Sequence, residues 1–145
     1  MPEMEMQWAV KAFEHAETFF SQLEKLAGSQ TQASQTAIQR FRFTTPALDE
    51  EIYAHFRREF PDMPVAGFDE HLHFKSPERK KQWREFINVY EKSVEDYNFG
   101  SLLRVDPFQD YSEENSIFVT RLQFIAIELA RCREGVQFGL KKTEE

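Results

Sequence analysis

The last third of the chain has the most regular pattern of apolar positions. From Tyr111 onward, apolar residues recur at intervals of four and three, which is the period of one face of an α-helix. These residues are Phe118, Leu122, Ile125, Leu129, Cys132 and Val136. The pattern predicts one long helix over residues 111–135. We expect residues 112–114 to cap its start, because acidic side chains favour the positive end of the helix dipole.

A row of polar residues accompanies this apolar stripe. The row lies beside the stripe on the predicted helix and consists of Arg121, Phe124, Glu128 and Arg131. Charges this close to a core are unfavourable unless they are paired. Two interpretations therefore remain open: the charges hold the domain together, or they face a partner.

Three further helices are predicted by the same period. The first covers residues 4–26 and is followed by Gly28, which suits a C-terminal cap. The second covers residues 46–60 and begins with a capping threonine and a proline. The third begins in the same way at residues 76–77, and its apolar positions continue to Tyr97.

The segments between these helices have no helical period. Residues 28–45 form a polar loop and connector rich in Gln, Ser and Thr. Residues 61–75 form a second connector with one helical turn near residues 69–72. Residues 101–111 are extended, and the apolar positions among them can pack or pair briefly. The tail, residues 138–145, is expected to fray.

The expected fold class is therefore all-α. Four main helices without alternating strands predict a bundle, with an irregular or briefly extended connector before the last helix. A chain of 145 residues without an internal repeat or a linker predicts a single helical domain over residues 1–145.

The composition is acidic, with a formal net charge of −7 and a pI near 5.2. Nucleic acids and anionic membranes bind through basic surfaces, so neither is expected as a direct partner. The absence of a long apolar run or a leader predicts a soluble, cytoplasmic protein, and we expect a monomer. The single cysteine, Cys132, excludes an internal disulfide and is expected in the core.

The sequence contains no set of residues that predicts catalysis, a cofactor or a metal site. His71 and His73 project to one side if extended, but a third zinc ligand is missing, so a solvated loop is favoured. The acidic pairs at 50–51, 95–96 and 113–114 diverge by about 100° on a helix and suit solvated faces. Patterns for a nucleophilic serine or for phosphate binding are also absent. We therefore expect a protein that is not an enzyme.

Basic and aromatic residues alternate at Arg40, Phe41, Arg42 and Phe43. Such a pattern can stack nucleic-acid bases. Because the patch is short and the chain is acidic, an amphipathic packing segment is the favoured interpretation.

Polar residues also gather around a glycine turn in residues 95–106. They include Asp96, Asn98, Arg104 and Asp106. Arginine is suited to fixed, two-pronged pairing with carboxylates. These residues either fasten the turn to the last helix or form a surface that recognises another protein.

Residues 95–106 (EDYNFGSLLRVD) and 111–135 (YSEENSIFVTRLQFIAIELARCREG) closely resemble the polysaccharide-biosynthesis-domain-containing protein family of eukaryotes. Residues 4–20 and 48–60 are similar to the first and second helices of that family. The resemblance covers most of the chain and fades in residues 28–40 and 61–75.

The resemblance implies a cytosolic, ATP-independent chaperone dedicated to translation elongation factor 1-alpha. It would bind the GTP-binding domain of that factor as the domain emerges from the ribosome. The polar positions that match the family motif are implied as client-binding candidates, although Arg121 and Glu128 are the first we expect to be structural. The candidates are Asp96, Asn98, Arg104, Asp106, Glu114, Asn115, Arg121, Gln123, Glu128, Arg131 and Arg133.

Two alternative functions remain. The family name suggests an enzyme of polysaccharide biosynthesis that modifies sugars or transfers methyl groups, which would require a deep pocket with convergent titratable groups. The other alternative is a general ribosome or RNA adaptor that binds through Arg40 and Arg42.

Overall fold

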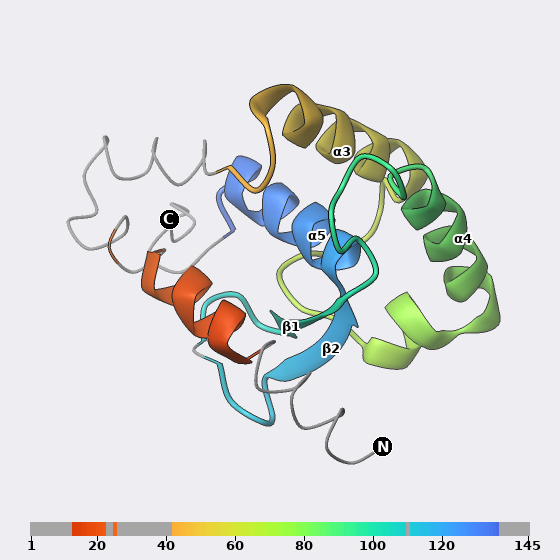
Figure 1. Ribbon diagram of the computed structural model, residues 1–145. Coiled ribbons are helices and arrows are strands. Elements are labelled where there is room, and N and C mark those ends of the chain that lie inside the picture. Colours follow the sequence, from red (N-terminus) through yellow and green to blue (C-terminus); the bar gives the residue numbers. More distant parts are fainter. Residues whose placement is uncertain (1–12, 23–24, 26–41, 110, 137–145) are drawn as a thin grey trace, which may run out of the picture.

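The computed structural model describes residues 13–22, 25, 42–109 and 111–136. Residues 13–22 are helical. The later elements are α3 (Pro46–Glu59), η1 (His71–Lys75), α4 (Pro77–Asn88), β1 (Gly100–Arg104), β2 (Ser116–Thr120) and α5 (Arg121–Arg133). In Figure 1, α5 runs through the middle, with α3 and α4 on one side and the helix of residues 13–22 on the other. The fold is therefore organised around its last helix.

Several predicted segments lie wholly or partly outside the described residues. These are the start of the first helix at residues 4–12, most of the polar loop at residues 28–41, and the tail at residues 138–145. The described part of the first helix, residues 13–22, is helical as predicted.

The start of α3 follows its sequence signals. The Thr45 side chain accepts a hydrogen bond from the Leu48 amide, and Pro46 occupies the first turn, where no amide donor is required. Ile52 and Phe56 are fully buried one turn apart. The predicted helix is thus confirmed, with its end at Glu59.

The start of α4 is also confirmed, but its predicted end is wrong. The Ser76 side chain accepts from the Arg79 amide, and Pro77 again follows the cap. The helix ends at Asn88, and residues 89–98 continue as turns. The amides of Val89, Tyr90, Glu91 and Ser93 bond to carbonyls three positions earlier. This tighter winding keeps Tyr90 and Val94 buried.

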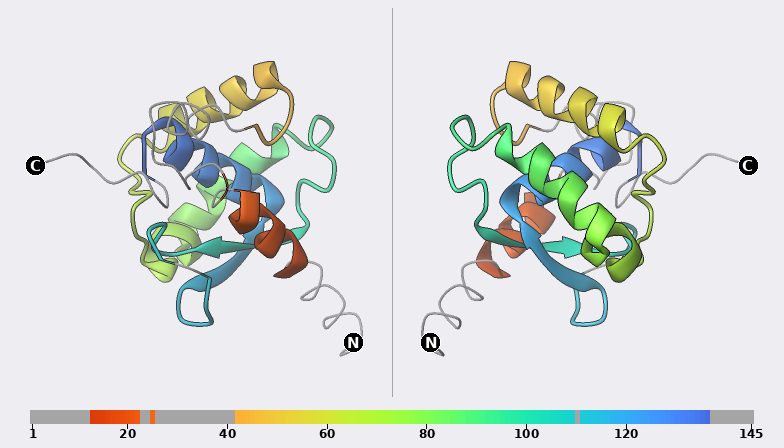
Figure 2. Two further views of the ribbon diagram at one scale, coloured as in Figure 1. Left: turned by 90° about the vertical axis from the view of Figure 1, so that its left-hand side faces the viewer. Right: turned by 90° about the vertical axis from the view of Figure 1, so that its right-hand side faces the viewer.

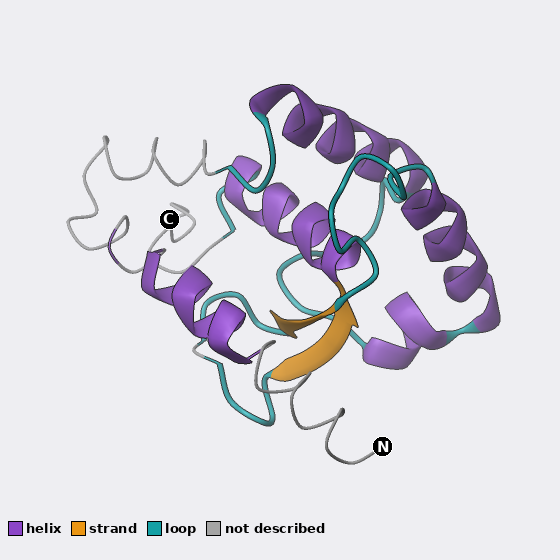
Figure 3. Ribbon diagram, in the orientation of Figure 1, coloured by secondary structure: helices purple, strands orange, loops and turns teal. Residues whose placement is uncertain are grey.

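The prediction of an all-α fold is wrong, because β1 and β2 form a two-stranded antiparallel sheet (Figure 3). The fold is α+β. Leu103 pairs with Ile117, and Ser101 pairs with Val119. Residues 116–120 (SIFVT) contain three β-branched side chains, which favour a strand over a helix. The extended segment predicted over residues 101–111 is confirmed for residues 101–104, which lie in β1, whereas residues 105–109 form bends and turns.

The last helix begins ten residues later than predicted, at Arg121 rather than at residue 111. Thr120 caps the helix: its hydroxyl accepts from the Gln123 amide, and the Gln123 side chain accepts from the Thr120 amide. Phe118 belongs to β2 and is 44% exposed. Its spacing of four residues from Leu122 suits a helix, but it fits equally well with a strand that runs straight into a helix.

The core surrounds α5. All residues from Leu122 to Cys132 are buried, so this helix has no solvated face. Cys132 is fully buried, as predicted. Figure 2 shows residues 13–22 in front of α5 on one face, where Phe19 contacts Phe124 with ring centroids 5.1 Å apart.

An aromatic cluster fills the space between α3, η1 and α4. The Trp83 ring stacks on Phe60 at 4.4 Å and on Phe74 at 5.5 Å between centroids. The Trp83 indole N–H donates to the His73 carbonyl at 2.9 Å. Stacked rings with a satisfied indole N–H make this part of the core rigid.

No helix in the described part of the chain is long and apolar enough to cross a membrane.

Candidate functional site

Three of the predicted site residues form a fully buried charged cluster. Arg104, Glu128 and Arg131 each have no exposed side-chain surface. Glu128 Oε2 lies 3.1 Å from Arg131 Nη1, and Glu128 Oε1 lies 4.0 Å from Arg104 Nη2. The cluster joins β1 to α5 in the interior, where a client protein has no access to it.

Arg131 ties three segments of backbone together. Its Nε donates to the Val65 carbonyl at 2.7 Å, and its Nη2 donates to the Arg104 carbonyl at 2.6 Å. Burial lowers the pKa of Arg131 from its usual value, although Glu128 opposes this shift. The connector after α3 is thereby fastened to the sheet and to α5.

The cluster holds two positive charges and one negative charge, so one positive charge is left for dipoles and rings to stabilise. Arg104 Nη1 donates to the Pro107 carbonyl at 2.7 Å. Its guanidinium lies 5.3 Å from the Phe20 ring centroid and 5.6 Å from that of Tyr111. Electron-rich ring faces and carbonyl oxygens both attract a desolvated cation. Burial raises the pKa of the Tyr111 hydroxyl, and the Glu128 charge adds to that effect, so Tyr111 stays neutral.

Three other predicted site residues hold the hairpin and its junction with α5. Asn115 Oδ1 accepts from the Asp106 amide at 2.8 Å, and Asn115 Nδ2 donates to the Asp106 carbonyl at 3.1 Å. The Asp106 carboxylate accepts from the Phe108 amide. Gln123 completes the helix cap. These polar side chains shape the loop between β1 and β2.

Ion pairs connect the end of α5 to α3. Arg133 Nη2 lies 2.8 Å from Glu50 Oε2. Glu134, which the sequence did not single out, accepts from Arg57 and from the Tyr53 hydroxyl, each at 2.8 Å. Partial burial opposes ionisation of Glu134, but these hydrogen bonds outweigh it and hold the pKa of its carboxyl below the usual value.

Four predicted site residues remain accessible: Asp96, Asn98, Glu114 and Arg121. Asp96 adopts a φ of 56°, in the left-handed region that aspartate tolerates better than most residues. Arg121, the first residue of α5, is half-buried. Among the described residues, its guanidinium makes no hydrogen bond or ion pair. Arg121 is therefore the cation of the motif that is available to a partner.

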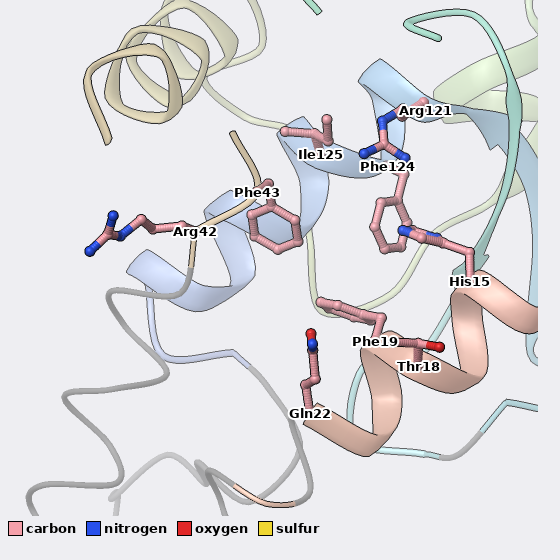
Figure 4. Close-up of a pocket in the computed structure, with 9 residues that line it drawn as sticks. All are labelled: His15, Thr18, Phe19, Gln22, Arg42, Phe43, Arg121, Phe124 and Ile125. Carbon is pink, nitrogen blue, oxygen red and sulfur yellow. The ribbon is translucent and has the colours of Figure 1, made fainter. Parts of the chain in front are cut away.

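Arg121 lines a pocket of about 240 Å³ between residues 13–22, residues 42–43 and the start of α5 (Figure 4). Phe19, Phe43 and Phe124 supply aromatic walls. In Figure 4 the Arg121 side chain lies near the His15 ring, whereas Arg42 extends away from the other side chains. The sequence analysis did not identify His15 as a site residue, because the approach of α5 to its helix leaves no local signal in the sequence.

His15 is the second polar group of this pocket. Its Nδ1 atom is buried and has no hydrogen-bond partner among the described residues, and its ring meets Phe124 edge-on at 5.3 Å between centroids. Burial lowers the pKa of His15, and the Arg121 charge lowers it further. A bound carboxylate would pair with Arg121 and could accept a hydrogen bond from His15. The described lining includes no carboxylate, so the chemistry of the pocket is that of an anion receptor.

The histidine pair at 71 and 73 does not form the geometry considered from the sequence. Both lie in η1, a helical turn on which positions i and i+2 do not face each other. His73 Nδ1 accepts from the Asp69 amide at 3.0 Å. Over the described ranges, no group of three His, Cys, Asp or Glu side chains is arranged to hold a metal ion.

Comparison with solved structures identifies a relative that has a similar fold. The solution NMR structure of protein yst0336 from Saccharomyces cerevisiae is similar, with a TM-score of 0.77 and 39% sequence identity. The match covers 93% of this chain and 86% of that one. The α+β fold is therefore shared with a relative of known structure.

Curated relatives carry the same family name. Protein PBDC1 of Mus musculus is 41% identical over 92% of this chain, which spans 61% of the mouse protein. The PBDC1 homolog of Schizosaccharomyces pombe is 40% identical over 97% of this chain, which spans 89% of that protein. The family model described as "PBDC1 protein" matches residues 4–141. These matches confirm the resemblance found in the sequence motifs: the chain belongs to the PBDC1 (polysaccharide biosynthesis domain containing 1) family.

Proposed function

We propose that this protein is a cytoplasmic, non-enzymatic chaperone that binds the GTP-binding domain of nascent translation elongation factor 1-alpha. The observation that carries the proposal is that the family motif contains both buried structural charges and an accessible arginine. Arg104, Glu128 and Arg131 are occupied inside the fold, whereas Arg121 is accessible in an aromatic pocket. The motif thus combines a rigid scaffold with a site for an acidic group.

The pocket suits a client segment better than a reacting substrate. A carboxylate of the client would pair with Arg121, and the apolar atoms beside it would pack on Phe19 and Phe124. Acid–base catalysis needs a proton donor and acceptor in reach of one reacting group. In the described lining, His15 and the two arginines are the titratable groups, and neither a carboxylate nor a cysteine is beside them.

Stoichiometric chaperoning needs no ATP, but it needs a difference in affinity. The protein must bind the incomplete GTP-binding domain more tightly than the finished one, because only differential affinity shifts a folding equilibrium. The net charge of −7 favours encounter with a basic client, and such attraction raises the association rate more than the affinity. Folding of the client around its nucleotide would then remove the bound segment.

The direct test is to translate the GTP-binding domain in a cell-free system that lacks the endogenous homologue. Wild-type protein should raise the yield of protease-resistant, GTP-bound domain and should be captured with the chains before GTP is added. Arg121→Ala should reduce both effects. Arg58→Ala removes an exposed arginine of α3 and should behave as wild type.

Failure of the wild-type protein to bind these chains or to raise their folded yield would reject the proposal. A rise in melting temperature on addition of S-adenosylmethionine would instead favour the enzyme alternative. Salt-sensitive RNA binding that is lost in Arg42→Ala would favour the adaptor alternative.

A further inference from the structure

A second concave surface lies on the opposite side of α5 from the Arg121 pocket. It is bounded by η1, α4, residues 97–98 and the junction of β2 with α5, and encloses about 380 Å³. Figure 2 shows α4 in front of α5 on this face. We call it the basic groove, and its polar residues are Lys75, Lys80, Arg84, Asn88, Asn98, Thr120 and Gln123.

Two of the three cations of the basic groove, Lys80 and Arg84, are not used by the described fold. Lys80 and Arg84 are exposed, and they stand one turn apart on the same side of α4. Neither side chain makes a hydrogen bond or an ion pair within the described part of the chain. The contact of Lys75 with Glu70 is 4.0 Å long and exposed, which makes it weak.

The basic groove carries positive charge although the chain as a whole is acidic. Acidic residues outnumber basic ones by 25 to 18, so a cation without an acidic neighbour is not the expected arrangement. No described residue that lines the groove is an aspartate or a glutamate. Three cations therefore converge on a concave surface that can take up negative charge.

The opposite rim presents an amide in a fixed position. The turn that carries Asn98 is held by a hydrogen bond from the Leu122 amide to the Tyr97 carbonyl, 2.9 Å, and by one from the Arg121 amide to the Phe99 carbonyl, 2.7 Å. The Asn98 side chain is exposed and has no partner among the described residues. An asparagine can donate to and accept from the backbone of an extended peptide.

The floor of the basic groove is apolar and rigid. Trp83 and Phe74 lie at its base with their rings 7° from parallel, and the Trp83 indole N–H is bonded to the His73 carbonyl. Ile87 and Tyr97 are half-buried beside them. An apolar side chain of a ligand would gain burial there without rearrangement of the protein.

We propose that the basic groove is a docking site for a short acidic segment of another protein. Carboxylates of the segment pair with Lys80 and Arg84, its backbone bonds to Asn98, and an apolar residue between the carboxylates packs on Ile87 and Tyr97. The inference is independent of the proposed chaperone function, because it concerns a different surface and can be tested without the elongation factor.

The same observations favour a peptide over RNA. A groove with three cations neutralises only about three phosphates, and RNA affinity is built from many such contacts. The net charge of −7 repels a long polyanion at distances that the groove does not screen. An acidic peptide brings fewer charges and supplies apolar side chains for the floor.

The test is fluorescence anisotropy with three labelled probes: a peptide of glutamate and leucine, the same peptide with lysine in place of glutamate, and oligouridylate. The full chain should bind the acidic peptide, and binding should weaken as salt is added. Lys80→Glu combined with Arg84→Glu should lower the affinity by roughly tenfold or more. Asn98→Ala should lower it less and leave the circular dichroism spectrum unchanged.

A matched control makes the same change in charge outside the groove. Lys81 and Lys92 are exposed, and the pair Lys81→Glu with Lys92→Glu should retain wild-type affinity. Equal losses in both double variants would overturn the proposal, because they would show a general charge effect. Preference of the wild-type protein for oligouridylate, or absence of binding to the acidic peptide, would overturn it as well.

Discussion

Arg131 and Arg121 occupy the same helix, ten residues apart, yet they do opposite things. Arg131 is buried in the core, where it binds Glu128 and three backbone carbonyls. Arg121 stands at the helix start beside a pocket, and its guanidinium has no ionic partner in the described structure. Residue type and family motif do not distinguish a structural arginine from a recognition arginine. Burial and the position of the nearest carboxylate do.

The largest change in stability is expected from the buried cluster of Arg104, Glu128 and Arg131. Glu128→Ala leaves two buried guanidinium groups without their carboxylate, so the free energy of unfolding should fall by about 3–5 kcal/mol. Glu114→Ala removes an exposed glutamate and should be neutral within about 0.5 kcal/mol. Urea unfolding followed by circular dichroism measures both. Equal midpoints for Glu128→Ala and wild type would show that the cluster does not stabilise the fold.

The hairpin loop should give an intermediate effect. Asn115→Ala removes the acceptor of the Asp106 amide and the donor to its carbonyl, so unfolding should become easier by roughly 1–2 kcal/mol. Thermal melting measures the change. A variant as stable as wild type would mean that water replaces both contacts and that the motif residues of this loop are free for another role.

The ion pairs between α3 and α5 should contribute less, and they should do so in a pH-dependent way. Because the pKa of Glu134 is lowered in the folded state, its contribution is present above the unfolded carboxyl pKa of about 4.3 and is lost as pH falls. Glu134→Gln should therefore lower stability by roughly 0.2–1 kcal/mol at neutral pH, with the difference vanishing in acid. Denaturant midpoints at several pH values test this. A difference that grew in acid would contradict it.

Replacement of the accessible Arg121 should change the pKa of His15 and have little effect on the stability of the fold. Arg121→Ala should change stability by no more than about 0.5 kcal/mol. It should raise the pKa of His15, which nevertheless stays below the usual value because burial is the larger cause. An NMR titration of the histidine rings measures this. Arg58→Ala is the matched control and should raise the pKa of His55 instead, since Arg58 is the second cause of the lowered value there.

Sequence reasoning succeeded where a signal is local. The Thr45–Pro46 and Ser76–Pro77 pairs predicted two helix starts, because an N-cap depends on a few neighbouring residues. The burial of Cys132 followed from helical period. The start of α5 was misplaced because strand β2 is stabilised by its pairing with β1, and pairing between distant residues leaves no mark in a local period.

The candidate site was predicted only in part, because contacts between residues distant in the sequence leave no local pattern. The motif identified the charged residues, but burial of Arg104 and Glu128 depends on how β1 meets α5. Glu134 and His15 were missed because their partners, Arg57 and Arg121, lie far away in the sequence. The basic groove depends on η1, α4 and the turn at Asn98 coming together, which no local pattern records.

The burial of Cys132 provides a built-in probe of how often the core opens. Cys132 is the only thiol of the chain, and it lies on α5, which is buried from Leu122 to Cys132. A thiol reagent can react only after α5 leaves its neighbours, so the labelling rate counts openings of the core without any introduced probe. The same rate, followed while a ligand is added, would report how strongly that ligand closes the fold.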